Sequence, residues 1–144
     1  MDIAEVIRNV PDFPKPGIQF KDITTLLLNP EALRQTVDML AERYGADKPD
    51  AIVGVESRGF IFGSALAYVM GVPLVLARKP GKLPGETIQE SFELEYGTDT
   101  IEMHVDAVSS GARVLIVDDL LATGGTVAAV VRLIERLGGV VTEA

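Results

Sequence analysis

The sequence predicts an α/β fold: an open, mostly parallel sheet with helices on both faces. Three observations predict it. Apolar segments of strand length alternate with helix-length segments from residue 51 onward, an order that builds parallel sheets. The run 114–117 is continuously apolar, as in strands that are buried on both faces. Glycines follow the expected helix ends, at Gly45, Gly71 and Gly138.

The segments before residue 51 are less regular. Three prolines and a glycine within 10–17 predict a stiff, irregular connector. Pro30 at the entry and Gly45 at the exit frame a longer helix, with apolar residues at helical spacing between them. In chain order we expect a short helix at 1–9, the connector at 10–17, a partly extended stretch at 18–28 and a helix at 31–44.

The alternating part of the chain follows. Phe92 and Leu94 alternate with glutamates, which predicts a half-buried strand, and a second alternating strand after Gly97 completes an antiparallel hairpin. An apolar stripe from Val127 to Leu137 predicts the last helix. In chain order we expect a strand at 51–55, a helix at 59–70, a strand at 72–77, a polar loop at 78–90, hairpin strands at 92–96 and 101–105 around a turn at 97–99, a strand at 113–117, the last helix and a strand from Val140.

Composition restricts the function classes. A chain of 144 residues with 47% hydrophobic residues fits one domain with a real core. The chain contains no run of eighteen apolar residues, so no membrane span is expected. A net charge of −8 argues against general nucleic-acid binding. The absence of cysteine excludes disulfides and thiolate metal sites. With an N-terminus unlike a signal peptide, these features predict a cytoplasmic protein.

The most informative motif is V-L-I-V-D-D-L-L-A-T-G-G-T at 114–126. Asp118 and Asp119 directly follow the buried strand, and ligands of parallel sheets bind beyond the carboxyl ends of the strands. Carboxylates accept hydrogen bonds, so this pair suits ribose hydroxyls or water on a divalent metal. The alternative is a strand-end turn whose acids cap a helix.

The second half of the motif suits a phosphate. Gly124 and Gly125 have no Cβ, so backbone N–H groups can approach an anion closely. Thr123 and Thr126 add hydroxyl donors, and the helix that follows offers its positive N-terminal end. A phosphate cradle beside hydroxyl-binding acids predicts a site for a sugar phosphate.

This run resembles the signature of the type I phosphoribosyltransferases that binds 5-phosphoribosyl 1-pyrophosphate (PRPP). It differs from the Walker loop, since no lysine follows the glycines, and from the dinucleotide fingerprint, since acids follow the strand. Within the family, 6-oxopurine enzymes usually carry Glu-Asp at the acid pair and a further Asp at the position of Ala122. The chain therefore resembles the adenine phosphoribosyltransferases. The resemblance implies that Asp118 and Asp119 hold the ribose, and that the 5′-phosphate is bound by Ala122, Thr123, Gly124, Gly125 and Thr126.

Two basic segments resemble the family's pyrophosphate site. V-G-V-E-S-R-G at 53–59 puts Ser57 and Arg58 at a strand end, where a guanidinium can bind a diphosphate bidentately. The family's matching loop often has a non-proline cis peptide. The alternative is a solvated strand-end arginine.

The second segment, A-R-K-P-G-K-L-P-G-E at 77–86, gathers Arg78, Lys79 and Lys82 between two Pro-Gly pairs. It resembles the mobile catalytic loop of the family, which implies that these three bases reach the pyrophosphate. The alternative is a disordered basic surface loop.

Two further motifs resemble the base-binding parts of the family. F-E-L-E-Y-G at 92–97 implies a proton-transfer or positioning role for Glu95, with Tyr96 as a hydroxyl partner; without the resemblance, Glu95 is the solvent face of a strand. P-G-I-Q-F-K-D-I implies a hood in which Phe20 stacks on adenine while the main chain at Gln19 and Lys21 reads the purine edge. An ordinary core position is the alternative for Phe20.

The resemblance covers nearly the whole chain. It implies a single domain at 1–144, with a hood at about 1–28, a flap at about 78–100 and the core sheet as remainder. It implies transfer of phosphoribosyl from PRPP to adenine, giving AMP and pyrophosphate, with Glu95, Arg58 and Lys82 as catalytic residues, Mg²⁺ carried on PRPP rather than by direct protein ligands, and a homodimer.

Some expectations stay open. Another purine phosphoribosyltransferase, for xanthine or a similar base, and a non-catalytic PRPP- or purine-sensing regulator remain as alternatives. Relatives continue beyond the strand at Val140, so the chain resembles a form shortened at its C-terminus. The single histidine, His104, alternates with apolar residues on a strand and is expected at the surface, without metal-ligand spacing.

Overall fold

The computed structural model describes residues 1–94, 97–120 and 124–144. The chain divides into two compact units, Met1–Arg43 and Tyr44–Ala144. The N-terminal unit contains α1 (Ile3–Val6), β1 (Arg8–Pro11), β2 (Gln19–Asp22), α2 (Thr24–Leu27) and most of α3 (Pro30–Gly45). The long helix expected at 31–44 is thus confirmed.

A hairpin in the N-terminal unit corrects two of the expectations from sequence. The first helix ends at Val6 instead of residue 9, and part of the expected connector at 10–17 is strand. β1 pairs antiparallel with β2, matching Arg8 with Asp22. The Arg8 guanidinium donates to the Asp22 carboxylate, with Nε 2.9 Å from Oδ2. Cross-strand pairing therefore overrides the weak helical pattern of a very short segment.

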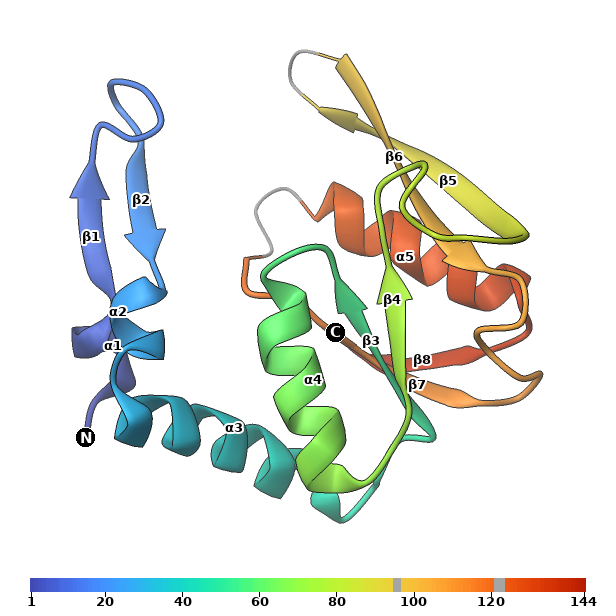
Figure 1. The fold of residues 1–144 in the computed structure, drawn as a ribbon, viewed down its shortest axis with the longest axis horizontal. Coiled ribbons are helices and arrows are strands. Elements are labelled where there is room, and N and C mark those ends of the chain that lie inside the picture. The colour runs from blue at the N-terminus through green and yellow to red at the C-terminus, as the bar shows by residue number, and fades with distance from the viewer. Residues whose placement is uncertain (95–96, 121–123) are drawn as a thin grey trace. The chain divides into compact units, whose positions relative to one another are not determined.

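The C-terminal unit is built on a parallel sheet (Figure 1). Its strands are β3 (Ala51–Val55), β4 (Leu74–Ala77), β7 (Arg113–Val117) and β8 (Val140–Glu143), in the order β4-β3-β7-β8. All three neighbouring pairs are parallel. Every residue of β3 is buried, as the continuous apolar pattern predicts for a strand covered on both faces.

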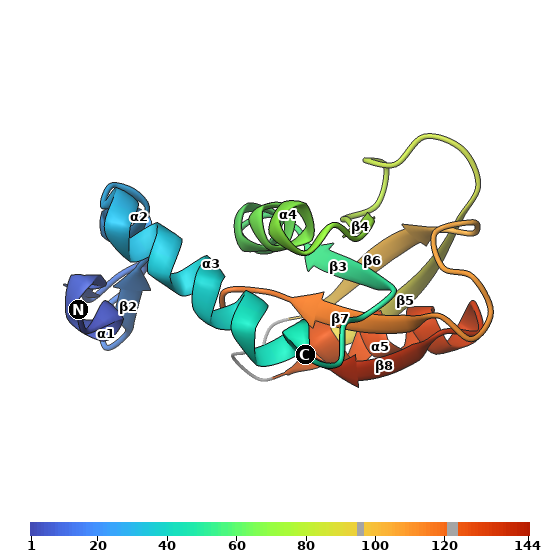
Figure 2. The same cartoon turned by 90° about the horizontal axis from the view of Figure 1, so that it is seen from below.

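Helices cover both faces of this sheet (Figures 1 and 2). α4 (Gly59–Met70) lies on one face and α5 (Gly125–Arg136) on the other. β5 (Thr87–Leu94) and β6 (Gly97–His104) form an antiparallel hairpin that packs against α5. The main core lies between sheet, hairpin and α5, with fully buried Val53, Met103, Val114, Val130 and Leu133. The predicted α/β class is confirmed.

Details of the hairpin differ from expectation. β5 begins at Thr87, so the polar loop expected at 78–90 is shorter. Gly97, expected in a turn with the two residues after it, is the first residue of β6 and pairs with Leu94. In the added part of β5, side chains of α5 bind the strand's main chain: Arg136 Nη1 donates to the Gln89 carbonyl at 2.7 Å. None of the helices in the described ranges has the length and apolarity needed to cross a membrane.

Candidate functional site

The ends of two neighbouring strands create the site. β3 and β7 run parallel in register, with Gly54 opposite Val117. The residues that follow each strand therefore emerge at the same edge of the sheet. After β3 come Glu56, joined to Ser57 by a cis peptide bond, and then Arg58. The non-proline cis bond that the family resemblance implied for this loop is present.

A glycine allows the two strand ends to approach. α4 begins at Gly59, where a Cβ atom would lie 2.6 Å from the Val117 carbonyl oxygen and 3.2 Å from Asp118 Oδ1. Any side chain here would displace the helix or the end of β7. The close approach puts Arg58 Nε 2.9 Å from Asp119 Oδ2. The Asp119 side chain is 8% exposed and that of Arg58 is 43% exposed, so the pair links a buried acid to an accessible base.

A cavity of about 570 Å³ opens at this edge. Its walls come from the strand end after β3, the strand end after β7, the loop after β4 and the start of α5. The lining residues are Glu56, Ser57, Arg58, Lys79, Asp118, Asp119, Leu120 and Thr126. The sequence singled out six of these residues: two acids, two bases and two hydroxyls. Glu56 adds a third acid to the lining.

Asp118 is electrostatically unusual. Burial of its half-buried carboxyl, together with the neighbouring Asp119, raises its pKa from the usual 3.8 to about 6. The main-chain N–H of Asp119, which donates to Asp118 Oδ1 at 2.8 Å, and the charge of Arg58 oppose that rise. A carboxylate whose ionisation is suppressed by burial and a like charge is typical of a functional site.

The phosphate-binding part of the motif leads into the start of α5. Gly124 adopts a left-handed conformation at φ 82° as the N-cap of α5, a conformation that glycine adopts without strain. α5 then starts at Gly125, and the adjacent Thr126 reaches the cavity. The N–H groups and positive dipole end of a helix start favour an anion. Ala122 and Thr123 lie outside the described residues.

The three bases of the loop at 77–86 differ in their relation to the cavity. Lys79 lines the cavity, and its Nζ lies 3.9 Å from Asp99 Oδ2 on β6. Arg78 and Lys82 are not lining residues. Arg78 instead binds Glu56, with Nε 2.9 Å from Oε1, and stacks its guanidinium over the Phe60 ring at 5.6 Å.

Glu56 is a site residue that the sequence analysis did not single out. It lines the cavity and accepts hydrogen bonds from Arg78 Nε and, at 3.1 Å, from the Lys79 N–H. Burial alone would raise its pKa, but these two donors outweigh burial and hold the pKa below its usual range. The available signal was its position directly before Ser57 and Arg58 at a strand end.

The residues expected to bind the base lie elsewhere in the chain. Gln19, Phe20 and Lys21 belong to β2 of the N-terminal unit. Phe20 meets Phe13 edge to face, with ring centroids 5.1 Å apart, and Lys21 Nζ donates to Asn9 Oδ1 at 2.6 Å. Glu95 and Tyr96 lie outside the described residues.

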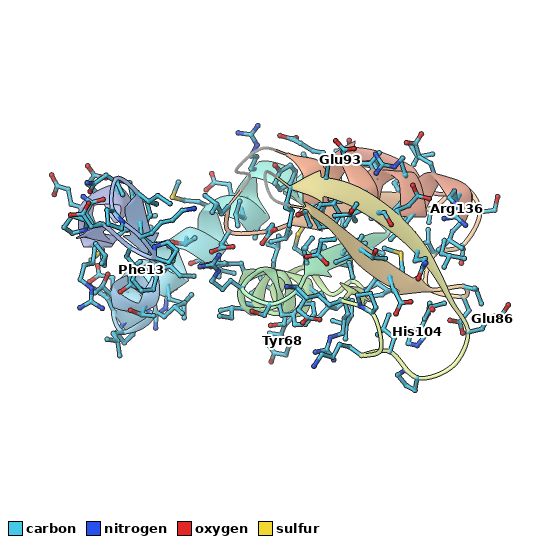
Figure 3. All side chains as sticks on the ribbon, turned by 90° about the horizontal axis from the view of Figure 1, so that it is seen from above. Phe13, Tyr68, Glu86, Glu93, His104 and Arg136 are labelled. Atoms are coloured by element: carbon cyan, nitrogen blue, oxygen red, sulfur yellow. The ribbon has the colours of Figure 1, made fainter. Side chains whose placement is uncertain are left out.

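The single histidine lies away from the cavity, beside the loop before β5. His104 ends β6, with Nε2 2.5 Å from the Pro84 carbonyl oxygen, and Figure 3 shows it near Glu86. In the described parts of the chain, no group of three or more His, Cys, Asp or Glu residues is arranged to hold a metal ion.

Comparison with known proteins identifies the family. The phosphoribosyl transferase domain family matches residues 22–141. An adenine phosphoribosyltransferase of Chloroflexus aurantiacus is 61% identical over 142 residues, covering 99% of this chain and 82% of the relative. The chain belongs to the adenine phosphoribosyltransferases. The family resemblance found in the sequence is thereby confirmed.

Solved structures of adenine phosphoribosyltransferases have the same fold. That from Thermoanaerobacter pseudethanolicus is 55% identical, has a TM-score of 0.94, and aligns over 97% of this chain and 81% of its own. That from Saccharomyces cerevisiae, complexed with adenine and an imino-altritol bisphosphate, is 41% identical with a TM-score of 0.92, covering 97% of this chain and 82% of its own. The adenine phosphoribosyltransferase fold thus extends over nearly the whole chain.

Proposed function

We propose that the protein transfers the phosphoribosyl group of PRPP to adenine, giving AMP and pyrophosphate in purine salvage. The observation that carries this proposal is the cavity in which Asp118 and Asp119 meet Arg58 and the start of α5. Acceptors for ribose hydroxyls, a guanidinium for a diphosphate and a helix start for a phosphate match the three parts of PRPP. Membership of the adenine phosphoribosyltransferases supports adenine as the acceptor.

Each part of PRPP has proposed ligands. The 5′-phosphate is bound at the start of α5 by the main chain of 122–125 and by Thr126, far from the reacting carbon, and this binding fixes the geometry at C1′. Asp118 and Asp119 hold the ribose. The pyrophosphate is bound by Ser57, Arg58 and the basic loop that carries Lys79 and Lys82.

The reaction breaks the C1′–O bond to pyrophosphate while adenine N9 forms the new bond to C1′. The bonding electrons leave with pyrophosphate, whose charge Arg58 and the loop bases stabilise, and the ribosyl centre becomes cation-like beside the two aspartates. N9 loses its proton, for which Glu95 is the proposed acceptor or positioning group. Closure of the basic loop would exclude water and limit hydrolysis of PRPP.

The donor set fits Mg²⁺ carried on PRPP. Asp118 and Asp119 line the cavity and could accept hydrogen bonds from water on the ion, without being its direct ligands. When bound, the ion would offset negative charge on the leaving pyrophosphate. Phe20, with the main chain of Gln19 and Lys21, is proposed to bind adenine. The homodimer and the cytoplasmic location stay predictions.

The test is AMP formation from adenine, PRPP and Mg²⁺, with hypoxanthine, guanine and xanthine in parallel. We expect turnover with adenine and at least a hundredfold less with the other bases. Turnover with xanthine would instead assign another purine specificity. Saturable PRPP binding without turnover of any base would assign a PRPP sensor. Size-exclusion chromatography with light scattering measures the mass of the protein in solution and so tests the homodimer.

A further inference from the structure

Glu56 holds the start of the basic loop from the cavity side. Its Oε1 accepts from Arg78 Nε at 2.9 Å and from the Lys79 N–H at 3.1 Å. Its own N–H donates to the Ala77 carbonyl at 2.9 Å. One residue at the end of β3 therefore binds three consecutive residues at the point where β4 ends and the loop begins.

Arg78 also contacts residues other than Glu56. Its N–H donates to the Glu102 carbonyl at 3.0 Å, and the Glu102 N–H donates back to the Arg78 carbonyl at 2.7 Å. The guanidinium lies over the Phe60 ring. Only 30% of the Arg78 side chain is exposed, and it does not line the cavity, whereas Lys79 does. Arg78 is therefore built into the wall behind the site.

Glu56 is a negatively charged residue in a cavity proposed to bind a polyanion. The side chain is 12% exposed, yet its hydrogen bonds favour the ionised form. A carboxylate in the wall of a cavity for a polyanion repels that ligand. Its electrostatic effect on PRPP is unfavourable, so a favourable contribution has to come from the groups it orders.

We propose that Glu56 is a positioning residue for the transfer: it fixes Arg78 and the Lys79 main chain so that the Lys79 ammonium faces the departing pyrophosphate. In this arrangement Arg78 acts through Glu56 and does not contact the pyrophosphate. The proposal rests on the proposed function and revises the role that the family resemblance implied for Arg78. It assigns pyrophosphate contact within this part of the loop to Lys79.

The decisive variant is Glu56→Gln, because the two explanations of Glu56 differ in sign. A pure charge effect would lower the KM for PRPP when the carboxylate is neutralised. Loss of positioning raises that KM, and we expect about a tenfold rise with kcat changed less than about threefold. Glu56→Asp keeps the charge and should stay within about threefold of the wild type. Glu135→Gln removes an exposed glutamate of α5 and is the matched control.

A double-mutant cycle with Arg78→Gln tests whether the two residues act as a unit. We expect the double variant to raise the KM no more than the larger single effect, because each substitution removes the same contact. Additive effects on the KM would overturn the proposal, since they would mean that Arg78 contacts the ligand independently. An unchanged or lowered KM in Glu56→Gln would overturn it as well.

Limited trypsin digestion measures how firmly the loop is held and does not require an enzyme assay. Cleavage after Arg78 and Lys82 should be about fivefold faster in Glu56→Gln than in the wild type and in Glu135→Gln. Equal cleavage rates would overturn the positioning role. If the wild type forms no AMP, the proposed function fails, while the digestion still decides whether Glu56 holds the loop.

Discussion

Arg58 and Asp119 form an ion pair across the ends of two neighbouring strands, with Nε 2.9 Å from Oδ2. The pair joins the residue proposed for pyrophosphate to a residue proposed for ribose. In the proposed reaction, PRPP would replace this contact with its own, with the guanidinium turned to the diphosphate and the carboxylate accepting from sugar hydroxyls. The acids and bases of the site are matched to each other before the ligand enters.

Substitution of Arg58 should affect PRPP most. Arg58→Gln removes the guanidinium, and we expect kcat/KM for PRPP to fall by about 10²–10³. The control is Lys48→Gln, which removes an exposed base before β3, at the opposite end of that strand. Steady-state assays with varied PRPP measure both. A loss below threefold in Arg58→Gln would contradict the assigned role.

Asp118→Asn should stabilise the fold while abolishing most activity. The pKa of Asp118 is raised to about 6, so its ionised form is unfavourable in the folded state at neutral pH. Replacing it with a neutral side chain removes that penalty, on the order of 1 kcal/mol after allowance for its partial exposure. Urea unfolding at pH 7.5 measures the gain, and a destabilised variant would contradict it.

The pH dependence of that gain has a definite sign. Between the usual pKa of 3.8 and about 6, the folded protein retains a proton that the unfolded chain has released. Wild-type stability attributable to Asp118 therefore falls as pH rises through this window and is constant above it. The advantage of Asp118→Asn should be full at pH 7.5 and shrink toward pH 4.5. An advantage independent of pH would show that another cause is at work.

Gly59→Ala should destabilise the C-terminal unit. The added Cβ would lie 2.6 Å from the Val117 carbonyl oxygen, so α4 or the end of β7 must shift. We expect a loss of about 2 kcal/mol in unfolding free energy and weaker PRPP binding. Gly45→Ala, at the end of α3, meets nothing within 4 Å and should be neutral or slightly stabilising. Similar losses in both variants would contradict the steric argument.

Glu90 should anchor the hairpin to α5. It accepts from Arg132 Nε at 2.8 Å and Arg136 Nη1 at 2.7 Å; Figure 3 shows Arg136 on α5. Hydrogen bonds from Arg132 and then Arg136 hold the pKa of Glu90 below its usual 4.5. The contribution of the ionised Glu90 to folding stability is therefore present above pH 4.5 and is lost as the pH falls through the folded-state pKa. We expect Glu90→Gln to lower Tm by roughly 1–3 °C at pH 7.5, with the difference closing in acid. Glu93→Gln on the same strand is the control.

The parallel part of the fold was predictable because its signals are local and strong. The strand 51–55 and the helix 59–70 have the predicted bounds, since buried strands read as continuous apolar runs and a glycine ends the helix. The β1–β2 hairpin was not predicted. Its stability depends on pairing Arg8 with Asp22 across fourteen residues of sequence, which no local pattern records.

The site divides in the same way. Asp118 and Asp119 were recognisable because they follow a buried strand, and Gly124 because its loop precedes a helix. Glu56 was not, since its significance comes from Arg78, which is 22 residues away in sequence and 2.9 Å away in space.

The sequence by itself determined the α/β class, the strand that carries the two aspartates, and the glycine loop that opens α5. Those features depend on side-chain size and polarity along short stretches of chain. Only the tertiary structure decided that Arg58 pairs with Asp119, that Arg78 is held by Glu56, and that Lys79 lines the cavity. Pairings of charges depend on distances between separate strands, and these are set by how closely α4 packs at Gly59 and by the register of β3, β4 and β7.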